Sequence, residues 1–155
     1  MTICFTGHRA LDAENISELF SLLESCVWEY AKKGNVSFRA GGALGFDTLA
    51  ALVVLTAREK YPDITLDLIL PCKNQTRGWR DTDIEKYNHI LSEANSVTYV
   101  SEEYTRFCMM ARNRALVDGA DLCIAYCNKP DGGSAYTVKY AQSRDVKVIN
   151  LADRC

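Results

Sequence analysis

Short apolar runs alternate along the chain with longer segments in which apolar residues recur every three or four positions. Such short runs are typical of β-strands, and the longer pattern is typical of helices with one buried face. Strands are expected at 2–6, 36–40, 64–70, 96–100, 121–126 and 146–151. The runs 67–70 and 123–126 are too continuous for half-exposed strands, which favours a parallel sheet covered on both faces.

Two helical segments allow finer predictions. The segment 13–33 has apolar residues at helical spacing, and we expect Asp12 to cap its beginning and Gly34 its end. The segment from about 45 to 61 is apolar nearly all round, so it should pack between the sheet and a further surface, such as a second subunit. Strands alternating with helices predict a doubly wound α/β fold.

The length of 155 residues indicates one domain, spanning 1–155. A net charge of -2 argues against a protein that neutralises a long nucleic-acid backbone. The chain has no apolar run long enough for a bilayer and no signal-like start, so we expect a cytoplasmic location without membrane contact. In a reducing cytosol scattered cysteines are buried free thiols, and we expect neither disulfides nor a metal site. The cysteines are Cys4, Cys26, Cys72, Cys108, Cys123, Cys127 and Cys155.

Glycine-containing turns recur where expected strands lead towards helices, at 6–9, 41–42 and 132–133. Such turns leave backbone N–H groups at a helix N-terminus, where an anion can bind, and glycine has no Cβ to hold a phosphate away. In a parallel sheet these turns open at one edge, together with 71–73 after the third strand. The pattern predicts a site for a phosphorylated small molecule, although glycines in purely structural turns would give the same signal.

Arginines and polar residues near these turns are candidates for ligand contacts. Arg9 and Arg112 are expected to clamp phosphate through their guanidinium groups, and Trp79 beside Arg80 could stack on a base. Any one of these arginines could instead be solvated or paired with an acidic neighbour. The expected ligand-binding residues are Gly7, His8, Arg9, Gly41, Gly42, Gly45, Asp47, Trp79, Arg80, Arg112, Asn113, Gly132, Gly133 and Ser134.

Three of these residues allow sharper statements. Asp47 could contact a ribose hydroxyl or act as a general base, or it could bond backbone N–H groups at the start of its own helix. His8 could be an acid or base, but a ligand hydrogen bond or a turn-stabilising role is favoured. Asp47 and His8 are therefore the catalytic candidates. Because Gly42 opens the second helix, Gly42→Val is expected to abolish binding while leaving the fold intact.

Five motifs in order make the chain resemble a known family. They are TGHR at 6–9, AGGALGFD at 40–47, LPC at 70–72 with a Trp-containing loop, ARNRALVDGADLCIAY at 111–126 and GGSAYTVKYA at 132–141. This set is similar to the YpsA-like group of the SLOG superfamily, which joins the DNA-processing protein DprA (SMF) and the LONELY GUY enzymes. The resemblance covers nearly the whole chain. It implies a single Rossmann-like domain, a three-layer α/β/α sandwich with a mostly parallel sheet of about six strands, that binds nucleotide-derived ligands, commonly as a homodimer.

The resemblance also points to one departure. LONELY GUY enzymes cleave N6-modified adenosine monophosphate at the glycosidic bond, using a glutamate in a PGGxGTxxE motif. Lys139, or Tyr140 with a one-residue gap, occupies that position here. The resemblance therefore favours a nucleotide-binding sensor or regulatory module over an enzyme. The alternatives are a nucleoside-monophosphate N-glycoside hydrolase that uses Asp47 or His8, and, with less support, a DprA-like module for single-stranded DNA.

Overall fold

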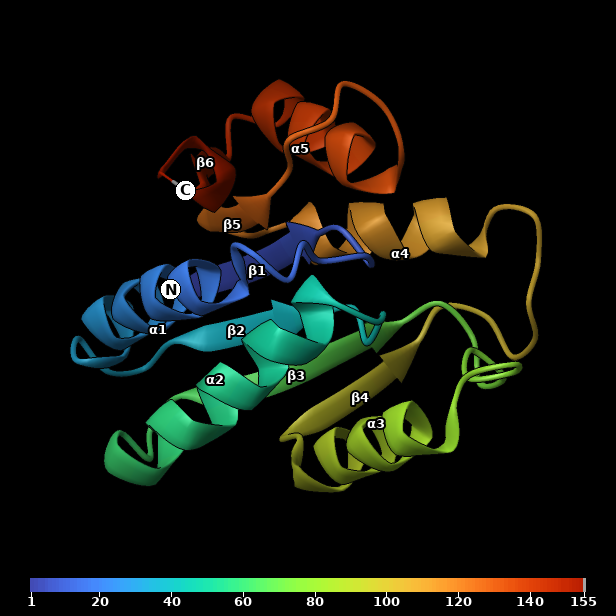
Figure 1. Cartoon of the computed structure of the whole chain (residues 1–155), viewed down its shortest axis with the longest axis horizontal. Helices are drawn as coiled ribbons and strands as arrows, with labels where there is room; N and C mark the ends of the chain where they lie inside the picture. Colours follow the sequence, from blue (N-terminus) through green and yellow to red (C-terminus); the bar gives the residue numbers. More distant parts are fainter. Residues whose placement is uncertain (155) are drawn as a thin grey trace.

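Six parallel strands form one sheet in the order β4-β3-β2-β1-β5-β6 (Figure 1). The computed structural model describes residues 1–154. The strands are β1 (Thr2–Gly7), β2 (Ser37–Ala40), β3 (Thr65–Leu70), β4 (Ser96–Tyr99), β5 (Leu122–Tyr126) and β6 (Lys147–Asn150). The chain builds outwards from β1 to β4 and then returns to place β5 on the other side of β1. The strand order therefore reverses between β1 and β5, which in doubly wound sheets opens a ligand crevice at the carboxyl ends of the strands.

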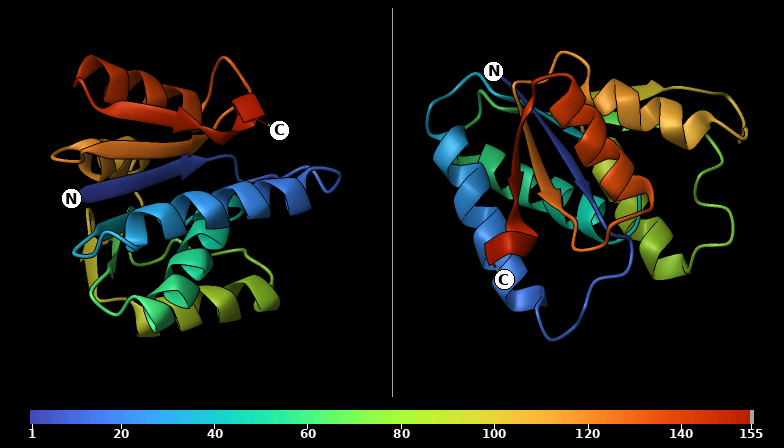
Figure 2. Two further views of the ribbon diagram at one scale, coloured as in Figure 1. Left: turned by 90° about the vertical axis from the view of Figure 1, so that its left-hand side faces the viewer. Right: turned by 90° about the horizontal axis from the view of Figure 1, so that it is seen from above.

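Helices cover both faces of this sheet, so the expected three-layer sandwich is confirmed (Figure 2). On one face lie α1 (Ile16–Ala31), α2 (Phe46–Lys60) and α3 (Asp81–Glu93). On the other lie α4 (Cys108–Val117) and α5 (Gly133–Ser143), and the 3₁₀ turn η1 (Leu151–Arg154) follows β6. A right-handed crossover puts its helix on one face of the sheet when the chain moves one way across the sheet, and on the other face when it moves back. The chain changes direction after β4, so α4 and α5 lie on the face opposite to α1, α2 and α3.

The structure corrects the expected caps of α1 and shows what surrounds α2. Asp12 does not cap α1: its carbonyl accepts the Asn15 N–H at 3.1 Å and its Oδ1 accepts the Glu14 N–H at 3.2 Å, so it forms a turn before the helix. The cap at the end of α1 is Lys32, so the expectation that Gly34 is the cap is also wrong; Gly34, with φ +75°, lies two residues further on. Most sides of α2 are apolar because it packs against the sheet, α1 and α3 of the same chain.

The two continuous apolar runs behave differently. β5 is buried at all five positions, as expected for a strand covered on both faces. In β3 buried and half-buried residues alternate, so the prediction that 67–70 is covered on both faces is wrong. The reason is that α4 and α5 lie over β1, β5 and β6 and reach only part of β3. Asp67 on the open side accepts hydrogen bonds from the hydroxyls of Ser37, Thr65 and Ser96.

The six cysteines among residues 1–154 are free thiols, and all but Cys127 are buried. Cys155 lies outside the described residues. Within 1–154 no three His, Cys, Asp or Glu side chains are grouped closely enough to hold a metal ion. In the same part of the chain, none of the helices combines the length and the apolar composition that crossing a bilayer requires.

Candidate functional site

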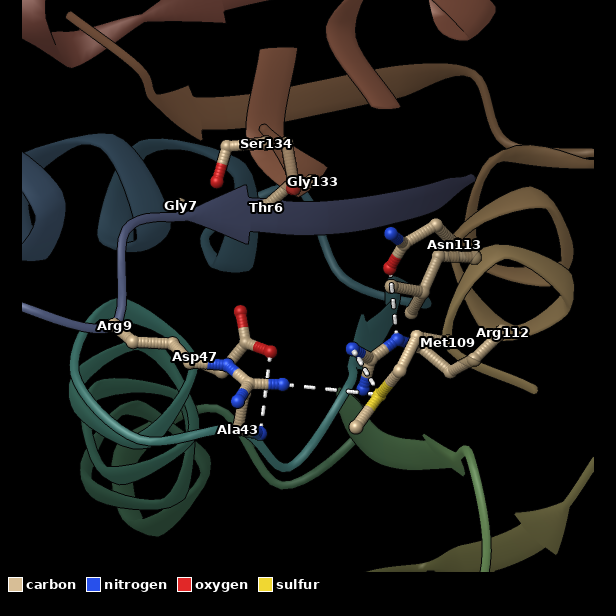
Figure 3. A pocket seen from close by; sticks show the side chains of 11 residues that line it. Thr6, Gly7, Arg9, Ala43, Asp47, Met109, Arg112, Asn113, Gly133 and Ser134 are labelled. Carbon is tan, nitrogen blue, oxygen red and sulfur yellow. Dashed lines mark hydrogen bonds between the residues drawn. The ribbon is translucent and has the colours of Figure 1, made fainter. Parts of the chain in front are cut away.

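A cavity of about 250 Å³ lies at the point where the strand order reverses (Figure 3). The end of β1, the turn between β2 and α2, one side of α4 and the N-terminus of α5 surround it. It is lined by Thr6, Gly7, Arg9, Ala43, Asp47, Met109, Arg112, Asn113, Leu116, Gly133 and Ser134. Residues of the turns at 6–9 and 132–133, and Ala43 directly after Gly42, therefore meet at one cavity, although they are far apart in sequence.

Arg112 forms one wall of the cavity and is only 5% exposed. It occupies a core-facing position of α4, one turn from Cys108 and one turn from Leu116, which are both buried. Its Nη1 donates to the carbonyl of Gly41, and its Nε donates to Oδ1 of Asn113 at 2.8 Å. Burial lowers the pKa of Arg112, an effect that the nearby Asp47 opposes. An arginine remains charged in proteins, so these contacts hold a buried cation in one orientation.

Arg9 extends over the cavity from the loop after β1 and is exposed. Its Nη2 lies 3.7 Å from Sδ of Met109, and Nη2 of Arg112 lies 3.8 Å from the same sulfur. Within residues 1–154, neither guanidinium has a carboxylate oxygen within 4.0 Å. The ion pairs in that part of the chain join Arg58 to Glu93 and Lys73 to Glu102. Two like charges thus meet at one wall with no directly paired anion.

Asp47 lies in the first turn of α2 and is 6% exposed. Its Oδ2 accepts the backbone N–H of Ala43 at 3.3 Å, so it stabilises the turn before its own helix and also lines the cavity. Burial raises the pKa of Asp47, and Arg112, the Ala43 N–H and Arg9 oppose that rise. Gly41 fits between the two charged groups: an added Cβ would lie 2.8 Å from Nη1 of Arg112 and 2.9 Å from Oδ2 of Asp47.

The N-terminus of α5 is open towards the cavity, whereas that of α2 is engaged. Gly132 occupies the α5 cap position with φ +97° and makes no side-chain cap bond, and Gly133 and Ser134 line the cavity. The first N–H groups of a helix lack partners within it and favour an anion. At α2 the Phe46 N–H already donates to the His8 carbonyl at 3.1 Å. Of these two helix N-termini, that of α5 is therefore the one left open at the cavity.

Trp79 and Arg80, expected in the site, lie outside the cavity lining. The Trp79 ring packs edge-on against Tyr87 of α3 at a centroid distance of 5.6 Å, and Arg80 is the exposed residue before α3. Their loop follows β3, which is separated from β1 by β2, so it lies away from the point where the strand order reverses. Strand order cannot be read from local sequence patterns, and this is why the prediction placed the loop with the others.

His8 and Gly42 do not line the cavity, and each has a structural role beside it. Nε2 of His8 accepts the Asn128 N–H at 3.0 Å, which joins the loops after β1 and β5, and burial together with Lys129 lowers its pKa. Gly42 has φ +74°, and a Cβ there would lie 2.3 Å from Cδ2 of Leu70. The expectation that Gly42→Val leaves the fold intact is therefore wrong, because the added atoms meet the core.

Thr6, Ala43, Met109 and Leu116 line the cavity but were not among the expected ligand-binding residues. Met109 and Leu116 share a helix face with Arg112, at three and four positions' distance, so helical spacing could have found them. Lys139 is exposed on α5 and outside the lining, and Tyr140 donates its hydroxyl to Oδ1 of Asp118 at 2.6 Å. Asp47 is accordingly the one acidic side chain among the described lining residues.

The fold and cavity define a Rossmann-like α/β domain with a cationic hollow at its topological switch point. A model of the YspA SLOG family (YpsA) matches residues 3–151, and the chain belongs to this family. The UPF0398 protein SH1465 of Staphylococcus haemolyticus is 26% identical over 142 residues, which cover 86% of this chain and 76% of that protein. A UPF0398 protein of Bacillus thuringiensis is 30% identical over 108 residues, covering 66% and 58%.

Solved structures give the same fold. DprA of Helicobacter pylori, described as binding single-stranded DNA in a unique mode, aligns with a TM-score of 0.71 and 20% identity over 96% of this chain and 63% of that one. DprA of Streptococcus pneumoniae aligns with a TM-score of 0.69 and 17% identity over 95% and 48%. The structural genomics target TM1055 aligns with a TM-score of 0.63 and 16% identity over 99% and 78%. The chain thus spans less than two thirds of either DprA chain and of the Bacillus thuringiensis relative.

Proposed function

We propose that this chain binds a phosphorylated small molecule, a nucleotide or nucleotide derivative, in the cavity at the carboxyl edge of the sheet and acts as a sensor or regulatory module. The observation behind the proposal is the pair of guanidinium groups of Arg9 and Arg112, which meet at Met109 without a carboxylate in ion-pair contact. A phosphate between them would accept charge-assisted hydrogen bonds from both. The open N-terminus of α5 would add backbone donors.

The volume and the polar groups of the cavity suggest which parts of the ligand it would enclose. Its volume of about 250 Å³ is below the range of roughly 300–1,000 Å³ usual for sites that enclose a drug-sized ligand. It would therefore enclose a phosphate and part of a sugar, with the base towards the mouth. Asp47 is the lining carboxyl group that could accept a hydrogen bond from a sugar hydroxyl. The bound ligand would then bridge α4, α5 and the loop after β1.

A hydrolase is the second candidate, and Asp47 is the specific observation in its favour. It is a buried carboxyl group in the cavity, and burial raises its pKa, as is common for catalytic acids and bases. In this alternative Asp47 would replace the glutamate of the LONELY GUY motif. A role on single-stranded DNA has only the fold of the DprA proteins behind it, and the net charge of -2 does not favour it.

Thermal-shift measurements against a nucleotide panel test the proposal. The panel contains nucleoside monophosphates, nucleoside diphosphates, the corresponding nucleosides and inorganic phosphate. Phosphorylated nucleosides should stabilise the protein, by about 2.7 kcal/mol at 100-fold above Kd, and nucleosides alone should not. Arg58→Ala is the control, because Arg58 pairs with Glu93 away from the cavity and its loss should leave the ligand response unchanged. No stabilisation by any phosphorylated nucleoside at millimolar concentration would contradict the proposal.

A further inference from the structure

Gln75 is a buried polar residue in the loop between β3 and α3, and its amide has no hydrogen-bond partner. The residue is 8% exposed. Within residues 1–154 neither Nε2 nor Oε1 of this side chain is bonded, although both atoms are shielded from solvent. An amide can both donate and accept hydrogen bonds, and burying it without any is unfavourable. Native proteins contain few such groups, and each calls for a reason, such as a second state of the molecule in which the amide is paired.

The neighbour of this amide is the diglycine turn that leads into α2. A Cβ added to Gly42 would lie 3.3 Å from Oε1 of Gln75, so the amide lies against the backbone of Gly42. A Cβ added to Gly41 would instead lie 2.8 Å from Nη1 of Arg112. The turn therefore separates two groups. On one side is the Arg112 guanidinium, which lines the cavity, and on the other is the unpaired amide of Gln75, which is not among the lining residues.

The peptide between Gly41 and Gly42 has its carbonyl on the Arg112 side, because this oxygen accepts a hydrogen bond from Nη1. In a planar trans peptide the C=O and the N–H point in opposite directions, so the Gly42 N–H points away from this guanidinium. A half-turn of the peptide plane would exchange the two groups. It requires large changes in ψ of Gly41 and in φ of Gly42, which is now +74°. Glycine at both positions permits these changes, because it has no Cβ to restrict them.

We propose that an anion bound in the cavity drives this half-turn, an inference that rests on the function proposed above. In the turned state the Gly41 carbonyl accepts a hydrogen bond from the amide of Gln75, so the amide is no longer unpaired. The Gly42 N–H then faces the cavity and donates to the anion. Nη1 of Arg112 is released from the carbonyl and donates to the anion as well. The diglycine turn is thus a ligand-driven switch and not a fixed cradle.

The groups on the two sides of the turn decide which state is populated. Without an anion the Gly41 carbonyl stays with Arg112, because a buried cation needs a partner more than a neutral amide does. A bound anion satisfies Arg112 directly through charge-assisted hydrogen bonds, so the carbonyl is no longer needed there. A ligand shifts such an equilibrium only if it interacts better with one of the states. The Gly42 N–H and Nη1 of Arg112 provide that difference, and pairing of Gln75 adds stability to the turned state alone.

Gln75→Met tests the switch, because methionine is an unbranched side chain of similar length without an amide. The free variant should melt about 2–4 °C above the parent chain, since it lacks the buried unpaired amide. It should bind inorganic phosphate and adenosine monophosphate about 10-fold more weakly, since the turned carbonyl has no partner. Gln142→Met, at an exposed glutamine near the end of α5, is the control and should change neither quantity. Unchanged affinity in Gln75→Met, or a loss of both stability and affinity, would overturn the switch.

Carbonyl-to-nitrogen correlation spectra observe the peptide itself. In protein labelled with ¹³C at the glycine carbonyl and ¹⁵N at the glycine nitrogen, a signal requires two consecutive glycines, which occur at 41–42 and 132–133. In the free protein, Gly133→Ala removes the second signal and so assigns both. With inorganic phosphate as the probe, both signals of the parent chain should shift. In Gln75→Met the same shifts should require about 10-fold more phosphate.

The two signals separate a failure of the switch from a failure of the proposed function. If the 132–133 signal moves while the 41–42 signal stays, the anion binds at α5 without turning the peptide, and the switch alone is overturned. If neither signal moves at millimolar phosphate and adenosine monophosphate does not bind, the proposed function is overturned and the switch with it.

Discussion

At the scale of single residues, the cavity is organised around a buried arginine whose hydrogen bonds go to neutral acceptors. Arg112 donates to the Gly41 carbonyl and to the Asn113 side chain, and Asp47 compensates its charge only from a distance. Burial of a cation without an ion-pair partner is unfavourable. A bound anion would reduce that penalty, so Arg112 should contribute to ligand binding.

Substitution of the two arginines follows from this reasoning. Arg9→Ala and Arg112→Ala should each weaken binding of a phosphorylated nucleoside by about 1.5–3 kcal/mol, the scale of a hydrogen bond to a charged group. That corresponds to roughly 10- to 150-fold in Kd. Lysine at either position should restore only part of the affinity, because it lacks the planar fork. Titration calorimetry measures the effect, and unchanged affinity in both alanine variants would remove these residues from the site.

The ionisation of Asp47 gives a stability prediction that is independent of the ligand. Burial raises its pKa above the ordinary value of about 3.9 that holds in the unfolded chain. Between these two values the folded chain binds more protons than the unfolded chain, so the free energy of unfolding falls as the pH rises. Asp47→Asn does not titrate and should lack this part of the slope.

The measurement is urea unfolding of the parent chain and Asp47→Asn from about pH 4 to about pH 8, in buffers without phosphate. All other titrating groups are shared, so the difference between the two proteins isolates Asp47. The parent chain should lose stability relative to the variant as the pH rises through the folded-state pKa. If the stabilities of the two proteins change in parallel with pH, or if the parent chain gains stability relative to the variant, the pKa of Asp47 is not raised in the folded state.

At the scale of elements, the two diglycine turns differ in whether they have room for an added Cβ. Gly42 has φ +74° and contacts the core, whereas a Cβ on Gly133, the first residue of α5, would have no neighbour closer than Nδ2 of Asn113 at 3.8 Å. Gly133 also lines the cavity. The first turn of α5 therefore offers a place where the cavity can be narrowed without disturbing the fold.

Gly133→Ala and Gly42→Ala form a matched pair. Gly133→Ala should keep or slightly raise the melting temperature, since alanine reduces the freedom of the unfolded chain, and should weaken binding about 10-fold, the equivalent of one charge-assisted bond. Gly42→Ala should lower the melting temperature through its positive φ and its contact with Leu70. Full affinity in Gly133→Ala would mean that the anion does not lie at the start of α5.

At the scale of the whole molecule, the question is whether the cavity binds or also catalyses. Glycosidic cleavage requires a carboxylate near the anomeric carbon to activate water or to stabilise positive charge. Lys139, at the position of the LONELY GUY glutamate, is exposed and outside the lining, which leaves Asp47 as the acidic side chain among the described lining residues. Asp47 already has a structural bond to Ala43.

We therefore predict that the chain does not release free base from adenosine monophosphate or its N6-substituted forms at a useful rate. Chromatography after prolonged incubation detects the base, and nucleotide binding is measured on the same preparation, so that inactivity is not confused with a failure to bind. Turnover near ~10 s⁻¹, typical of enzymes, that disappears in Asp47→Asn would establish the hydrolase instead. Asp47→Asn is the suitable variant because an amide oxygen can still accept the Ala43 N–H.

The sequence by itself determined the main helices and strands and the edge of the sheet at which the cavity lies. A continuous apolar run such as 122–126 is typical of a strand covered on both faces of a parallel sheet. Glycines such as Gly132, at φ +97°, mark turns that other residues rarely adopt. Both are local properties, because they depend on neighbouring residues and on backbone conformation. The family resemblance rested on the same turns and is confirmed.

Only the tertiary structure decided which of those turns meet. Strand order depends on pairing between distant segments, which leaves no local trace in the sequence. The order β3-β2-β1-β5 separates Trp79 from the cavity and brings Arg112 of α4 against Gly41. The two faces of α4 were likewise settled by packing: residue 109 faces the cavity and residue 110 faces solvent because one helical step turns the side chain by about 100°.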